Sequence, residues 1–207
     1  MAWQSALEKH PEHARLIGMI AIESGNLELE LAGLFARMLM IPLRIGRAVY
    51  LTPQAAHARL AVLKNAARAE FDRPTRSKAM REKYASALKQ VIEIHDRAST
   101  AINKRHRIVH DSWGFSDDDA EVSRLMIDGN PDRESAAVPV NELEDQLNSL
   151  RKLIADAGDL ARGFYRNPPR MVDMRLSGTR PQKTDTQTRW PRPSPPKTGR
   201  LRRSSPP

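Results

Sequence analysis

Apolar residues recur at alternating intervals of three and four near the end of the chain, between Leu143 and Phe164. This spacing places about one apolar side chain per turn on a single face of an α-helix. The pattern therefore predicts an amphipathic helix from about Val140 to about Tyr165, whose apolar face must pack against other helices. The residues of this face are Leu143, Leu147, Leu150, Ile154, Ala157, Ala161 and Phe164.

Three earlier segments show the same helical period. The first is predicted from about residue 11 to residue 40 and is ended by Pro42. The second is predicted to begin at Thr52-Pro53, as N-cap and first helical residue, and to run to about residue 69. The third is predicted over about residues 75 to 109. Together these segments predict an all-α protein, an antiparallel helical bundle.

The segment between the last two helices, about residues 113–139, is poor helix material because it contains acidic runs and turn-forming residues such as Asp128-Gly129-Asn130-Pro131. Residues 122–127 and 135–138 flank that turn and are predicted to pair as a short hairpin. The bundle should therefore carry one small irregular or β-hairpin insert.

Residues 167–207 differ in composition from residues 1–166. They hold nine of the 15 prolines and a net charge of +8 out of the total of +9, with few large apolar side chains. Such a segment buries too little apolar surface to offset the entropy of ordering. We therefore expect a helical domain over residues 1–166 and a disordered basic tail over residues 167–207.

Cysteine is absent from the 207 residues, which excludes disulfides, zinc-thiolate sites, iron–sulfur clusters and thiol nucleophiles. A reducing compartment, the cytoplasm, is the expected location. The most apolar stretch, residues 31–45, is interrupted by Arg37, Pro42 and Arg44, so no transmembrane helix is expected. Residues 1–11 lack the cationic start and apolar run of a signal peptide.

Charge is uneven within the predicted domain: residues 37–110 carry +11, whereas residues 111–166 carry −7. One interpretation is an internal pattern of salt bridges between packed helices. The other is a face that binds a polyanion such as RNA.

Arg105 interrupts the apolar face of the third predicted helix, between Ile102 and Val109. An unpaired buried guanidinium would cost several kcal/mol, so this side chain should meet a carboxylate, lie over an aromatic ring or face a cleft. The candidate carboxylates on the first helix are Glu23, Glu28 and Glu30.

His106 and His110 stand four residues apart and so share a helix face. Arg105 and His110 are separated by roughly 7–8 Å along the helix axis, at ~1.5 Å per residue, which leaves room for one phosphodiester.

The string Arg105-His106-Arg107-Ile108-Val109-His110 resembles the motif of the HEPN superfamily: an arginine, a polar Asn, Asp or His, three residues and a histidine. The setting is also similar, because a HEPN domain is a small all-α bundle with this motif near the end of a long helix. The resemblance covers about residues 14–166.

This resemblance implies a metal-independent endoribonuclease that needs no cofactor, and a homodimer in which two motifs line a shared cleft. It also implies a toxin–antitoxin or anti-phage setting, with RNA as substrate and an antitoxin or regulatory protein as a further partner. Arg105 would be the phosphate-binding cation, His110 the catalytic histidine, and His106 the polar residue after the arginine, where many relatives have Asn.

These residue types suit RNA cleavage without a metal. Histidine titrates near neutral pH and can take the proton of the ribose 2′-OH. Arginine stays protonated and can grip two phosphate oxygens as charge develops on the phosphorane. The need for a 2′-OH would make such an enzyme ignore DNA.

Three alternatives remain open. The first is a non-catalytic HEPN module for dimerisation or RNA binding. The second is a metal site built on His106 and His110, for which Asp111 or His95 would have to supply a third ligand, without any Glu following His106. The third is a protein whose basic middle and tail bind DNA and RNA alike in a salt-sensitive way. The other histidines, His10, His13, His57 and His95, are expected on the surface or bonded to partners.

Overall fold

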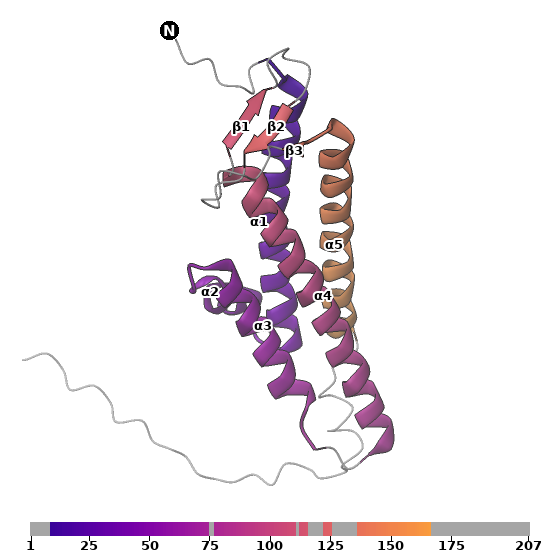
Figure 1. Ribbon diagram of the computed structural model, residues 1–207. Helices are drawn as coiled ribbons and strands as arrows, with labels where there is room; N and C mark the ends of the chain where they lie inside the picture. Colours follow the sequence, from indigo (N-terminus) through magenta and orange to yellow (C-terminus); the bar gives the residue numbers. More distant parts are fainter. Residues whose placement is uncertain (1–8, 75–76, 111, 116–121, 126–135, 167–207) are drawn as a thin grey trace, which may run out of the picture.

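Figure 1 shows the computed structural model, which describes residues 9–74, 77–110, 112–115, 122–125 and 136–166. The described part is mainly helical, so the prediction of an all-α chain is confirmed at that level. The predicted tail, residues 167–207, lies outside the described residues. The elements are α1 (Pro11–Met38), α2 (Leu43–Leu51), α3 (Ala56–Phe71), α4 (Lys78–His110), β1 (Ser112–Phe115), β2 (Val122–Leu125), β3 (Ala136–Ala137) and α5 (Val140–Arg166).

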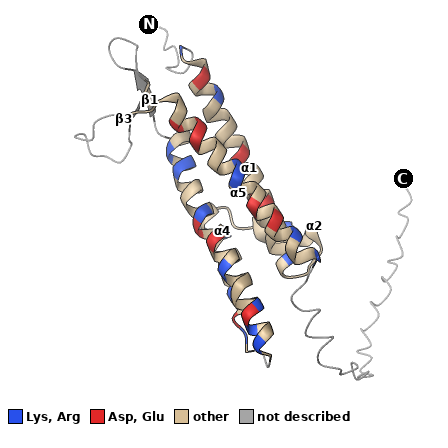
Figure 2. Cartoon of the chain, turned by 90° about the vertical axis from the view of Figure 1, so that its right-hand side faces the viewer, with Lys and Arg blue, Asp and Glu red and all other residues tan. Residues whose placement is uncertain are grey.

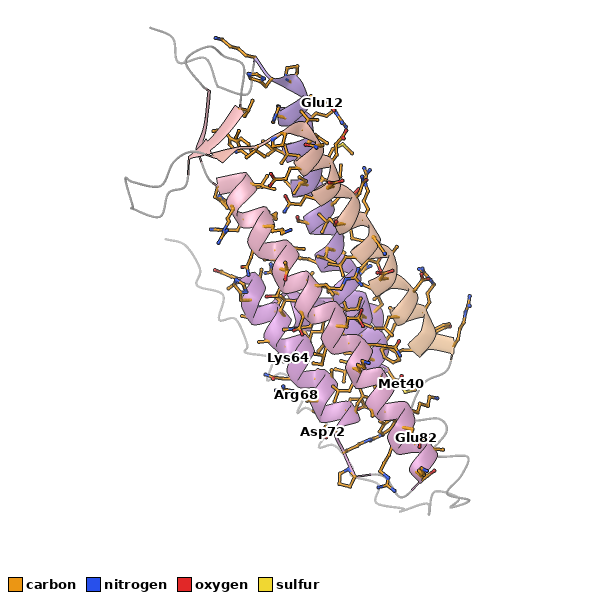
Figure 3. All side chains as sticks on the ribbon, turned by 45° about the vertical axis from the view of Figure 1, so that its right-hand side comes forward. Glu12, Met40, Lys64, Arg68, Asp72 and Glu82 are labelled. Carbon is orange, nitrogen blue, oxygen red and sulfur yellow. The ribbon has the colours of Figure 1, made fainter. Side chains whose placement is uncertain are left out.

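The three long helices α1, α4 and α5 lie side by side along the length of the molecule, and α2 and α3 pack beside one half of it (Figure 1). Figure 3 shows that α1 and α4 run in opposite directions: Glu12, in the first turn of α1, lies at one end of the molecule and Glu82, near the start of α4, at the other. No helix among the described residues is long and apolar enough to cross a bilayer.

The relation between α1 and α5 corrects the prediction of an antiparallel bundle. Glu23 pairs with Arg151 at 3.2 Å, and Glu30 lies beside Gly158, seven residues further along both helices. Contacts that advance together in this way show that α1 and α5 are parallel. The reason is that α4 runs the length of the molecule back to the end where α1 begins, so α5 starts at that same end (Figure 1).

The first helix ends two residues before the predicted end, in a Schellman motif. Met40 adopts a left-handed backbone conformation, with φ of 55°. Its N–H donates to the carbonyl of Arg37 at 3.1 Å, and the N–H of Ile41 donates to the carbonyl of Ala36 at 3.0 Å. These bonds reverse the chain before Pro42, which therefore begins the next helix as its N-cap.

The predicted helix start at Thr52-Pro53 is wrong. Thr52 instead ends α2, where its hydroxyl donates to the carbonyl of Ala48 at 2.7 Å. Arg59 donates to the carbonyls of Pro53 and Gln54 at 2.8 and 2.7 Å, which holds that segment outside a helix. Consequently α3 begins only at Ala56.

The insert contains a small antiparallel sheet in the order β1-β2-β3. Ser123 and Arg124 of β2 face Ala137 and Ala136 of β3, so the two segments expected to form a hairpin are paired. β1 was not predicted, and it pairs along the other edge of β2. The acidic and turn residues between these strands lie outside the described residues.

Buried apolar residues form two clusters. The main core lies between α1, α3, α4 and α5 and takes in Tyr50 of α2; it includes most of the predicted apolar faces. The terminal core lies at the end of the molecule that carries the strands. Its buried residues are Leu16, Ile20, Ile108, Val138, Leu143 and Leu147.

Candidate functional site

The two motif histidines lie together at the C-terminal end of α4. His106 and His110 are both exposed, one helical turn apart, with ring centroids 4.7 Å apart and ring planes tilted by 48°. We refer to them as the histidine pair. The predicted shared face is therefore present, and the helix persists far enough to form it because α4 ends at His110.

Arg105 lies on a different side of α4 from His110. Each residue of an α-helix advances about 100° around the axis, so five residues place these two side chains about 140° apart. The rise of roughly 7–8 Å along the axis is therefore accompanied by this rotation around it. On a regular helix the two side chains thus project from different sides of α4.

None of the three carboxylates proposed as partners pairs with Arg105. Glu23 pairs with Arg151, Glu28 pairs with Arg59, and Glu30 makes no ion pair among the described residues. The Nε atom of Arg105 is buried and has no hydrogen-bond partner. Of the three environments expected for this guanidinium, the structure shows the cleft.

That cleft is a groove of about 780 Å³ between α4 and α5, which we call the α4–α5 groove. Its α4 wall is basic, and Figure 2 shows Lys and Arg recurring along this helix. Its α5 wall is mixed, with Glu142 and Asp145 near the start of the helix and Lys152 further along. The basic wall consists of Arg97, Lys104, Arg105 and Arg107.

The polar character of α4 explains why the groove is open. Thr100 and Lys104 occupy the side of α4 that faces α5, where an apolar residue would draw the helices together. Closer to the N-terminus of α4, Arg97 forms an ion pair with Asp156 of α5 at 2.8 Å. Closer to the C-terminus of α4, Ile108 is buried in the terminal core. The groove thus lies between two points of contact.

Arg107 was not predicted as a site residue. It stands three positions before His110 and therefore lies on the neighbouring turn of the same side. Its side chain is exposed and also lines the α4–α5 groove. Arg107 is thus a cation beside the histidine pair, whereas Arg105 lies deeper in the groove. The three-residue spacing was visible in the sequence, but the motif treats this position as variable.

The other histidines agree with their expected structural roles. His13 is buried, and its Nε2 lies 2.9 Å from the carbonyl of Val138. His10 packs edge-on against His13, with centroids 5.7 Å apart. His95 contacts Asp96 at 2.7 Å, and His57 is exposed.

A metal site gains no support from the described residues, among which no group of three or more His, Asp or Glu side chains is close enough to hold an ion. His95 lies 11 positions before His106, about 16 Å along α4 at ~1.5 Å per residue. Asp111 lies outside the described residues.

Comparisons with known proteins found no matching family model, no matching curated protein and no matching solved structure. The resemblance to HEPN proteins therefore depends on the motif and on its place near the end of a long helix.

Proposed function

We propose that this chain is a metal-independent endoribonuclease of the HEPN type, which cleaves RNA by attack of a ribose 2′-OH on the adjacent phosphodiester. The observation that carries the proposal is the histidine pair, two exposed imidazoles with centroids 4.7 Å apart. Cleavage of this kind needs one group that takes a proton and one that gives a proton. Two adjacent histidines supply both without a metal.

The chemistry assigns one role to each imidazole. Neutral His110 takes the proton of the 2′-OH as its oxygen attacks phosphorus. Protonated His106 gives a proton to the departing 5′ oxygen as the P–O bond breaks. The products are a 2′,3′-cyclic phosphate and a 5′-OH end. After the step His110 carries the proton and His106 is neutral.

Two arginines hold the phosphates in this proposal. Arg107, on the turn next to His110, stabilises the charge that develops on the phosphorane, since a guanidinium can donate two hydrogen bonds to phosphate oxygens. Arg105 keeps the phosphate-binding role implied by the resemblance, but at a neighbouring phosphate. Arg105 lines the α4–α5 groove, along which a single RNA strand would approach the histidine pair.

The test is cleavage of a mixed RNA pool by the purified full-length chain in excess EDTA. We expect cutting that leaves cyclic-phosphate ends, loses at least about 100-fold in rate in His106→Ala or His110→Ala, and is unchanged in His57→Ala. His57 is a matched control because it is also an exposed helical histidine. Arg107→Ala should reduce the rate constant, and Arg105→Ala should chiefly weaken RNA binding. Loss of activity on removing metal would overturn the proposal.

The alternative is a non-catalytic HEPN module that binds RNA or dimerises. It is favoured by the separation of about 140° between Arg105 and His110 around α4. This module would bind RNA through the basic wall of the groove and leave it intact. Binding that is lost in Arg105→Ala and unchanged in His110→Ala, with no cleavage by any variant, would select this alternative.

The cellular setting belongs to the same proposal. A cytoplasmic ribonuclease of a toxin–antitoxin or anti-phage system would act on RNA, form homodimers and be held in check by an antitoxin or regulatory protein. Purification of the chain with its bound protein, followed by the cleavage assay with and without that protein, tests this setting.

A further inference from the structure

The α4–α5 groove is lined by charged side chains that the chain itself does not pair. Lys104 and Arg105 of α4 and Asp145 of α5 all line it and make no ion pair or hydrogen bond with any described residue. Nearer the start of α4, Arg97 and Asp156 do join the same two helices, at 2.8 Å. The groove therefore holds cations on one wall and a carboxylate on the other that are available to a ligand.

The charges of the two walls are offset along the helices. Because α5 runs parallel to α1, and α1 runs opposite to α4 (Figure 3), α4 and α5 are antiparallel. Counting from the pair Arg97–Asp156, Lys104 lies at the level of Ser149. Asp145 lies four residues beyond that level, about 6 Å along the axis at ~1.5 Å per residue. Side chains at this offset can hold two edges of a small planar group placed between them.

The floor of the groove is apolar. Ile20, Leu150 and Leu153 line it, and each is at most 5% exposed. The volume of about 780 Å³ lies within the range of roughly 300–1,000 Å³ that is usual for small-molecule sites. Such sites combine an apolar lining with a few polar groups that fix orientation. The floor thus suits the flat face of a heterocycle, and the walls suit its polar edges.

The charges of the walls select one heterocycle among the common nucleobases. A carboxylate can accept two adjacent hydrogen bonds, and a lysine ammonium can only donate. Guanine has two adjacent donors, N1–H and the 2-amino group, on one edge and two adjacent acceptors, O6 and N7, on another. Adenine, cytosine and uracil each place an acceptor beside the donor of their Watson–Crick edge, which would repel a carboxylate. Guanine therefore matches both walls.

We propose that the α4–α5 groove binds a guanine nucleotide, either free or as one residue of an RNA strand. Asp145 accepts hydrogen bonds from N1–H and the 2-amino group, Lys104 donates to O6 and N7, and Arg105 holds the phosphate. Guanine binding itself does not require RNA cleavage. The preference for guanine that it would give to the ribonuclease rests on the proposed function.

The bound guanine is separate from the nucleotide that would be cut. Six residues place Lys104 and His110 about 120° apart around α4, at 100° per residue. The groove therefore lies on a different side of this helix from the histidine pair. A guanine in the groove would lie elsewhere along the strand from the phosphodiester at the histidine pair.

Titration calorimetry of the full-length chain with nucleoside 5′-monophosphates tests the choice of base. We expect GMP to bind at least about tenfold more tightly than AMP, CMP or UMP, since one correct bidentate pair gives discrimination of this size. IMP, which lacks only the 2-amino group of GMP, should bind about tenfold more weakly than GMP for the same reason. Equal binding of GMP and AMP would overturn the proposal.

Substitutions in the two walls test the contacts. Asp145→Asn should weaken GMP binding at least about tenfold and make it equal to IMP binding, because an amide replaces one acceptor by a donor. Glu144→Gln is the control, since Glu144 is an exposed carboxylate next to Asp145 that does not line the groove. Lys104→Gln should weaken GMP binding severalfold, whereas Lys89→Gln, at an exposed position of α4, should not. Circular dichroism checks that each variant is folded. GMP binding that survives Asp145→Asn unchanged would overturn the assignment.

Two short RNA strands separate the possible sources of the guanine. One is an oligouridylate and the other carries a single internal guanosine, both with 2′-O-methyl groups that prevent attack by the 2′-OH. Tighter binding of the strand with guanosine, lost in Asp145→Asn, would identify guanine in RNA as the ligand. If GMP binds through Asp145 but the two strands bind alike, the ligand is a free guanine nucleotide.

These titrations report guanine binding without any cleavage. A chain that binds GMP through Asp145 but does not cut RNA keeps the guanine site and loses the ribonuclease function. A chain that cuts RNA in EDTA but binds GMP no better than AMP loses the guanine site and keeps the ribonuclease function. The two proposals therefore fail in different assays.

Discussion

The main core and the terminal core divide the molecule into a region that supports folding and a region that carries the candidate site. The main core brings together four helices and three aromatic rings, in which the centroid of Phe71 lies 5.8 Å from that of Tyr84 and 5.6 Å from that of Phe164. The terminal core has six buried aliphatic residues and borders the α4–α5 groove. Polar, imperfectly paired residues such as Arg105 are therefore tolerated where fewer apolar side chains pack together.

The strongest test of this comparison removes one large side chain from each core. Phe71→Ala should lower the free energy of unfolding by about 3–5 kcal/mol, because it leaves a cavity among the aromatic rings. Ile108→Ala should cost less, about 2–3 kcal/mol, because the terminal core can relax toward the groove. Urea unfolding followed by circular dichroism measures both. A larger loss for Ile108→Ala would show that the two cores do not differ in this way.

How much of this division could be predicted depends on the length of each apolar pattern. The stripe of α5 continues for about six turns at 3.6 residues per turn, and the helix was predicted from about 140 to 165 and found at Val140–Arg166. α2 was missed because its nine residues give too short a pattern, and its packing needs the close contact of Gly46 with Ala36. Gly46 and Ala36 approach each other only in the tertiary fold, so the local sequence does not predict their contact.

The candidate site was predictable in part. Arg105 stood out in the sequence because a charge interrupted an apolar face, and the structure places it in the groove. The groove itself was not predictable, since it needs α5 to lie beside α4 with the right offset. The angle of about 140° between Arg105 and His110 follows from the helical period and was predictable from their five-residue spacing.

A titratable group in the main core gives the next largest effect. Burial, together with the nearby Glu28 carboxylate, raises the pKa of the Tyr50 phenol above its ordinary value of 10.0. Above about pH 10 the unfolded chain releases this proton and the folded chain keeps it, so stability should fall by about 1.4 kcal/mol per pH unit. Tyr50→Phe should remove that part of the decline between pH 9 and pH 11 in urea unfolding. An unchanged decline would mean that Tyr50 ionises freely in the folded chain.

A substitution of Arg105 tests how much this site residue lowers the stability of the folded chain. Arg105→Met keeps the length of the side chain and removes a buried Nε that lacks a hydrogen bond, so it should stabilise the chain by about 1 kcal/mol. The same variant should weaken RNA binding. Arg81→Met, at an exposed position of the same helix, is the control and should change stability by less than about 0.5 kcal/mol. Destabilisation by Arg105→Met would show that the guanidinium supports the fold.

The smallest expected effect concerns the end of α4 that holds the histidine pair. The indole N–H of Trp113 donates to the carbonyl of Ile108 at 3.0 Å. The last four carbonyls of a helix lack partners within the helix, so this bond satisfies one of them and holds the final turn. Trp113→Phe should therefore cost about 0.5–1 kcal/mol, and the loss should be local.

Amide hydrogen exchange can locate that loss. In Trp113→Phe we expect faster exchange at residues 106–110 and unchanged exchange at residues 91–98, which pack in the main core. Thr52→Val removes a similar hydrogen bond at the end of α2 and should leave the end of α4 unaffected. Because the contact between His106 and His110 requires a helical final turn, cleavage should fall in parallel with protection there. Equal acceleration in both segments would mean that the two cores open as one unit, and that the site is as firmly held as the fold.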